Sequence, residues 1–156
     1  MHDPPRADQK LLDENAALKL RIQQLEELDA GRTRAEESLR ESEEHLREAQ
    51  RVARLGSWEF DLATGFVSWS DELFRLQRRA QGRQAPTYQE LQRNYTPESW
   101  KRLGVAVERA RTTGAPYELD LEAIRDDGTL WWQTARGEAV RSMTGEVAGL
   151  RGTVVD

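Results

Sequence analysis

The fold of this chain is decided by the stretch Leu55-Gly-Ser-Trp-Glu-Phe-Asp-Leu-Ala-Thr-Gly-Phe-Val-Ser-Trp-Ser70. Its first half alternates, with Trp58, Phe60 and Leu62 on one side and polar residues between them. That period of two is typical of a half-buried β-strand. A turn containing Gly65 interrupts the pattern, and a second short apolar run follows at once. Two such runs around a glycine-containing turn predict a β-hairpin.

The residues before this hairpin are strong helix formers with a seven-residue repeat. Leu11, Leu18 and Leu25 recur every seven positions, and Asn15 and Ile22 lie in the interleaved set. If the leucines are d positions, Asn15 is a polar residue at an a position, which favours a two-stranded parallel coiled coil in register. The alternative is a single amphipathic helix that packs on its own domain.

Farther along the helix, the apolar residues fit a second frame that is offset from the first. Gly31 follows the offset and costs a helix about 1 kcal/mol relative to Ala, so we expect a weak point or break near residues 29–33. Gly56 is expected to end the helix, because glycine readily adopts positive φ. The residues predicted to form a dimer seam are Leu11, Asn15, Leu18, Ile22, Leu25, Leu39 and Leu46.

Composition excludes several classes of site. The 156 residues carry a net charge of −5 and no cysteine. The absence of cysteine excludes disulfides, thiolate metal sites and a cysteine nucleophile, and the net charge does not favour nucleic acid. No apolar run is long enough to span a bilayer, and no signal peptide is recognisable. The sequence therefore predicts a cytoplasmic protein without a membrane segment.

After the hairpin the pattern predicts helices and then three strands. Helices are expected at 72–77, after Thr87 and from Pro97 to Gly114, with Ser70 or Asp71, Thr87 and Thr96 as N-caps. Strands are expected at 117–124, 130–140 and 147–155, the first two joined by an Asp-Gly turn. This order predicts an α+β domain with a five-stranded antiparallel sheet and its helices on one face. The predicted divisions are a disordered terminus at 1–7, a helical coiled coil at 8–55 and the α+β domain at 56–156.

The order and the motifs together resemble the PAS domain family, in its broad subgroup from bacterial sensor proteins. The resemblance covers about residues 44–156. The motifs that carry it are Leu55-Gly-Ser-Trp-Glu-Phe-Asp-Leu, Thr64-Gly65, Trp69-Ser-Asp-Glu-Leu-Phe74, Pro97-Glu98, Pro116-Tyr-Glu-Leu119, Arg125-Asp-Asp-Gly-Thr129, Trp132, Ala135-Arg-Gly137, Gly145 and Gly152-Thr-Val-Val-Asp156. It implies strand order 2-1-5-4-3 and a homodimeric sensory or signal-relay module that acts through its N-terminal helix. It also implies a downstream output domain such as a histidine kinase, cyclase or regulator.

The resemblance further implies a pocket between the third helix and the sheet. Haem would need a His ligand, and the only histidines are His2 and His45, outside the domain core. A photoactive flavin adduct would need a cysteine. A non-covalent flavin or a small metabolite stays open, and the bulky Trp131 favours an empty, self-packed pocket. Alternation lets either Trp131, Gln133 and Ala135 or Leu130, Trp132 and Thr134 face this pocket, and the resemblance favours the first set. The pocket residues predicted by this comparison are Leu103, Val107, Leu119, Leu121, Ala123, Trp131, Gln133, Leu150 and Val154.

No motif predicts catalysis or metal binding. His45 and the helix glutamates are interpreted as a solvated helix face, and Asp126-Asp127 as part of a hairpin turn. Arg75, Arg78, Arg79 and Arg83 form a basic patch without the interleaved aromatics that stack on bases. We therefore predict a non-enzymatic module that does not bind nucleic acid. The alternative function is a passive dimerisation scaffold with a filled core and no ligand.

Overall fold

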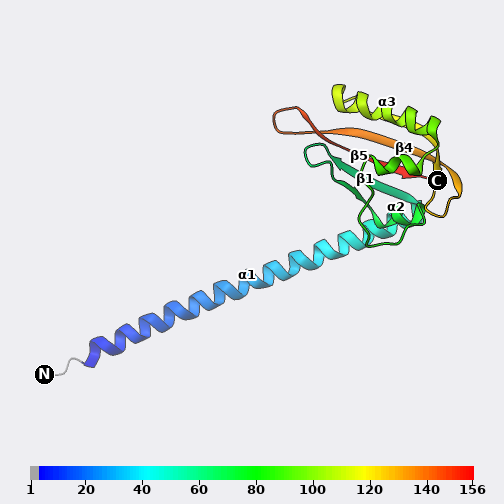
Figure 1. Cartoon of the computed structure of the whole chain (residues 1–156). Helices are drawn as coiled ribbons and strands as arrows, with labels where there is room; N and C mark the ends of the chain where they lie inside the picture. The colour runs from blue at the N-terminus through cyan, green and yellow to red at the C-terminus, as the bar shows by residue number, and fades with distance from the viewer. Residues whose placement is uncertain (1–3) are drawn as a thin grey trace. The chain divides into compact units, whose positions relative to one another are not determined.

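The computed structural model describes residues 4–156, in two compact units that divide after His45. In chain order the elements are α1 (Pro4–Ala53), β1 (Leu55–Asp61), β2 (Val67–Trp69), α2 (Asp71–Leu76), the 3₁₀ helix η1 (Glu90–Asn94), α3 (Pro97–Thr113), β3 (Tyr117–Ile124), β4 (Leu130–Arg141) and β5 (Val147–Val155). Figure 1 shows these elements along the chain, with α3 across one face of the sheet.

Helix α1 is longer and more regular than predicted. It begins at Pro4, so residues 4–7 are helical and not disordered, while residues 1–3 lie outside the described part of the chain. Proline is tolerated in the first turn because the first amide groups of a helix have no intrahelical partner. The helix is also continuous through 29–33, so the expected break is absent. The cost of one glycine is small beside the hydrogen bonds on both sides, and easier bending of this segment stays a prediction.

The predicted seam residues of α1 are all exposed. Leu18, Ile22 and Leu25 keep 61%, 53% and 51% of their accessible surface, and Leu39 and Leu46 keep similar fractions. The Asn15 amide donates to the Leu11 carbonyl at 3.1 Å, which is a bond within one helix. The Pro4–His45 segment therefore presents an unburied row of leucines.

The end of α1 differs from the prediction. The helix stops at Ala53, and Arg54, not Gly56, takes the positive φ of 47°. Gly56 already belongs to β1 and is buried. It is required there for another reason, since a Cβ atom on it would lie 2.8 Å from the Cβ of Leu73 in α2.

The sheet has the predicted order β2-β1-β5-β4-β3, with all pairs antiparallel. Alternation places Trp131, Gln133 and Ala135 of β4 on the buried face. Trp132 lies on the opposite face and is 61% exposed. The structure thus confirms the predicted orientation of β4.

Local sequence signals explain most helix ends. The Ser70 hydroxyl accepts from the Leu73 amide, and the Thr96 hydroxyl accepts from the Ser99 amide, as N-caps do. Gly114 ends α3 with φ 75°. The helix predicted after Thr87 is the shorter η1, preceded by a reciprocal bond pair in which Thr87 and Glu90 cap each other's backbone amides.

Candidate functional site

A cavity of about 60 Å³ lies inside the α+β unit, between the buried face of the sheet and the helices. Its walls come from all five strands, from α2 and α3, and from the segment between these two helices. The residues that line it are Trp58, Phe60, Val67, Trp69, Leu73, Gln77, Tyr88, Leu91, Tyr95, Leu103, Val107, Tyr117, Ala135, Leu150 and Val154. This volume has room for a few water molecules.

The structure distributes the nine predicted pocket residues over the core and the cavity wall. Four of them line the cavity: Leu103, Val107, Leu150 and Val154. Leu121, Ala123, Trp131 and Gln133 are buried in the core beside it, and Leu119 is half-buried. Trp131 and Gln133 do not line the cavity, whose wall includes four residues of β1 and β2: Trp58, Phe60, Val67 and Trp69.

Aromatic rings form the part of the wall that sequence analysis did not assign to the pocket. Six rings border the cavity, those of Trp58, Phe60, Trp69, Tyr88, Tyr95 and Tyr117. Phe60 stacks on Tyr88 with ring centroids 5.4 Å apart and an interplanar angle of 11°. The strand alternation that places Trp58 and Phe60 on one face was visible in the sequence, but the approach of Phe60 to Tyr88 depends on the loop between α2 and α3.

Gln133 is 2% exposed and is held by one hydrogen bond to a tyrosine. Its Nε2 donates to the Tyr95 hydroxyl at 2.9 Å. Burial raises the pKa of Tyr95 to about 12, and the bond from Gln133 opposes that shift. The amide of Gln133, which the resemblance places among the pocket residues, is thus satisfied at Nε2, whereas its Oε1 has no hydrogen-bond partner.

Gln77 is the other buried amide of this region. It follows the last residue of α2, is 2% exposed and lines the cavity. Both of its backbone polar groups form hydrogen bonds. Its amide donates to the Leu73 carbonyl, and its carbonyl accepts from the Asp126 amide at 3.1 Å. Its Oε1 is buried without a hydrogen-bond partner. A polar residue at a helix end gives no sequence signal of burial, which is why it was missed.

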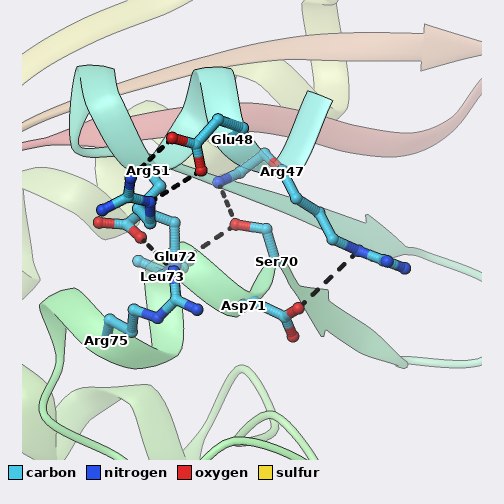
Figure 2. A network of polar contacts seen from close by, with 9 residues as sticks. Arg47, Glu48, Arg51, Ser70, Asp71, Glu72, Leu73 and Arg75 are labelled. Carbon is cyan, nitrogen blue, oxygen red and sulfur yellow. Dashed lines mark hydrogen bonds and ion pairs between the residues drawn. The ribbon is translucent and has the colours of Figure 1, made fainter. Parts of the chain in front are cut away.

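The end of α1 is joined to α2 by a polar network (Figure 2). Arg47 pairs with Asp71 at 3.9 Å, and Arg75 pairs at 3.1 Å with Glu72, which is only 6% exposed. Glu48 binds Arg51 through two nitrogen atoms and, with a smaller contribution from Glu72, holds the pKa of Arg51 above its usual value. These charges lie beside the first turn of α2.

Ser70 lies at the centre of this junction. Its hydroxyl accepts from the Leu73 amide (Figure 2). It also accepts from the Ser57 amide at 2.9 Å. Gln50, in the last turns of α1, donates to the Ser57 hydroxyl at 3.1 Å. Because Leu73 also lines the cavity, α1, β1 and the cavity wall share one short chain of contacts.

The opposite face of the sheet carries an open groove of about 950 Å³. Cross-strand ion pairs cover it, Glu118 with Arg136 at 2.9 Å and Glu138 with Arg151 at 2.8 Å. These charges are paired within the chain, so the groove offers less to a ligand than the cavity does.

Within the described residues, no cluster of three or more His, Cys, Asp or Glu side chains is arranged to hold a metal ion. Over the same residues, no helix combines the length and apolar character needed to cross a membrane.

Comparisons with known proteins identify the fold. A sensory box histidine kinase/response regulator from Burkholderia thailandensis E264 superposes with a TM-score of 0.56 at 20% identity, over 71% of this chain and 82% of that one. The N-terminal domain of a diguanylate cyclase with a PAS/PAC sensor from Marinobacter aquaeolei gives 0.59 at 21% identity, over 65% and 94%. A PAS domain from Colwellia psychrerythraea gives 0.57 at 14% identity, over 72% and 94%.

No protein-family profile matches the sequence, and no curated protein matches it. The structural likeness, together with the strand order, shows that the chain has the PAS fold, an α+β fold preceded here by a long N-terminal helix.

Proposed function

We propose that this chain is a sensory and signal-relay module of a bacterial signal-transduction protein, a member of the PAS family that dimerises through α1. The observation that carries the proposal is the direct run of α1 into β1, with Gln50, Ser57 and Ser70 linking the helix to α2. Histidine kinases and cyclases among the structural neighbours support an output domain of that kind. A cytoplasmic location and the absence of catalysis in this module are part of the proposal.

The relay would be mechanical. A ligand that changed the cavity would move Leu73, and Leu73 touches Gly56 at the start of β1. Since cores repack between discrete arrangements, such a shift would alter the crossing or register of a helix pair. The outer sheet face, with the exposed Trp132, would supply further dimer contact.

The dimer is tested by light scattering and sedimentation equilibrium at micromolar concentration. The Leu18→Asp and Leu25→Asp double variant places two charges in the seam and is expected to yield monomers. Leu20→Asp is the matched control, since Leu20 is equally exposed but lies off the seam. A wild-type chain that is monomeric, or a control that dissociates as readily as the seam variant, would contradict the proposed seam.

The second candidate function is a passive dimerisation scaffold. The small cavity and the bond between Gln133 and Tyr95 favour it, because a site for a flavin or other drug-sized ligand needs about 300–1,000 Å³. Absorbance and native mass spectrometry of the purified protein discriminate the two functions, followed by a thermal-shift screen. A bound or stabilising small molecule supports the sensor, and a uniformly blank result supports the scaffold.

A further inference from the structure

We infer that the cavity binds a small methylated ammonium ion, an inference that names the ligand class of the proposed sensor and rests on that proposed function. The inference combines three features of the cavity wall. They are its aromatic composition, the absence of charged side chains among the described residues that line it, and the unpartnered Oε1 of Gln77.

The aromatic rings set the first requirement for a ligand, which is a positive charge. Aromatic faces carry negative electrostatic potential, so they attract cations, and enclosure by several rings is a recurring way to bind methylated ammonium groups. Trp69 already accepts a cation, since the Arg79 guanidinium lies 5.8 Å from its ring centroid. Arg79 is itself neutralised by Asp126 at 2.6 Å. Trp58, Phe60, Trp69 and Tyr88 are half-buried, which places this aromatic wall within reach of the surface.

Gln77 sets the second requirement for a ligand, which is a hydrogen-bond donor. A buried amide oxygen without a donor is costly, by about 1–3 kcal/mol, and a ligand that carries one N–H would satisfy it. A fully deprotonated anion has no donor for Gln77, and any anion would be repelled by the negative potential of the ring faces and of the amide oxygen. A neutral alcohol satisfies Gln77 and gains little from the rings. A protonated tertiary amine meets both requirements.

The volume of the cavity sets the third requirement, which is a small ligand. The cavity of about 60 Å³ admits only a few non-hydrogen atoms without rearrangement. Methyl groups on the nitrogen also lower the cost of removing the cation from water, since they replace strongly hydrated N–H groups. Trimethylammonium therefore fits better than ammonium, which is strongly hydrated, or a large ring system, which is too big.

The test measures binding of three probes to the full chain by isothermal titration calorimetry, with tryptophan emission as a second readout. Trimethylammonium carries a charge and one N–H, tetramethylammonium carries the charge alone, and tert-butanol offers a neutral donor of similar shape. Sodium chloride at the same ionic strength corrects for salt. We expect trimethylammonium to bind best and tert-butanol at least about tenfold more weakly.

Variants then locate the site. Gln77→Leu is expected to weaken trimethylammonium binding about tenfold while changing tetramethylammonium binding little, because only the former donates to Oε1. Trp132→Leu, on the exposed face, is the control and should change neither affinity. If Gln77→Leu does not fold, the comparison of the three probes on the wild-type chain still decides the charge preference.

Two outcomes overturn the inference: tert-butanol binding as tightly as trimethylammonium, or no binding of either cation at millimolar concentration. The second outcome would indicate that only water occupies the cavity. Neither outcome depends on whether the chain is a dimer, which light scattering and sedimentation equilibrium measure separately. A failure of this inference is therefore distinguishable from a failure of the proposed dimeric module.

Discussion

Gly56 of β1 and Leu73 of α2 lie so close that a methyl group on Gly56 would stand 2.8 Å from the Cβ of Leu73. Gly56 lies three positions after the end of α1, and Leu73 is 2% exposed and lines the cavity. The contact therefore joins the helix junction to the interior, and it requires a residue without a side chain at position 56.

Gly56→Ala is expected to destabilise the α+β unit by about 1–3 kcal/mol, because the added carbon forces β1 and α2 apart. Urea unfolding followed by circular dichroism measures the change. Gly104→Ala in α3 is the control, since nothing lies within 4 Å of the added carbon there. That control should stabilise the protein by up to about 1 kcal/mol. Equal effects at both positions would show that the contact with Leu73 is unimportant.

Ser70→Ala should cost about 1–2 kcal/mol, because it removes the N-cap of α2 and leaves the Ser57 amide without its acceptor. Thermal denaturation of the two proteins measures this loss. Ser68→Ala, two residues earlier on β2, is the matched control and should lie within about 0.5 kcal/mol of wild type. A loss of similar size in the control would mean that the hydroxyl at position 70 has no special role.

If α1 pairs as we propose, Asn15→Leu is expected to raise the melting temperature of the helix pair and to allow oligomers larger than a dimer. A polar residue at an a position restricts a coiled coil to two strands at a cost in stability, and Leu removes that restriction. Sedimentation equilibrium should then show species larger than dimers. If the variant behaves as the wild type in both measurements, Asn15 does not lie in a helix interface.

Because Tyr95 is buried, we expect the free energy of unfolding to fall at alkaline pH. Its pKa is about 12 in the folded protein, against about 10 in an unfolded chain, because burial disfavours the phenolate. Above pH 10 the unfolded state therefore binds fewer protons than the folded state, so stability is fully present below pH 10 and falls as the pH rises toward 12.

The check is the pH dependence of urea unfolding between pH 9 and 11 for the wild type and Tyr95→Phe. Burial also raises the pKa of Tyr88 and Tyr117, so only the difference between the two proteins reports on Tyr95. Tyr95→Phe should be less stable at pH 9, where Gln133 loses its partner, and should decline less steeply above pH 10. Parallel curves would contradict the assignment.

Local signals in the sequence predicted the elements and their order. The alternation around Trp58, the Asp-Gly turn before β4 and the caps Ser70 and Thr96 each act within a few residues, so they could be recognised without tertiary information. The resemblance to PAS domains then supplied the strand order, which the structure confirms.

Tertiary structure decided the cavity and the helix junction. Gln77 is buried because the strand pairing brings the β3–β4 turn against the end of α2, where the Asp126 amide binds the Gln77 carbonyl. Tyr95 reaches Gln133 across 38 positions of sequence. Gly56 tolerates no side chain because α2 packs against it, whereas its sequence context suggested only a helix end. Local patterns determined where helices and strands form. Contacts between residues far apart in sequence determined which side chains meet, because burial and close approach depend on the packing of the whole domain.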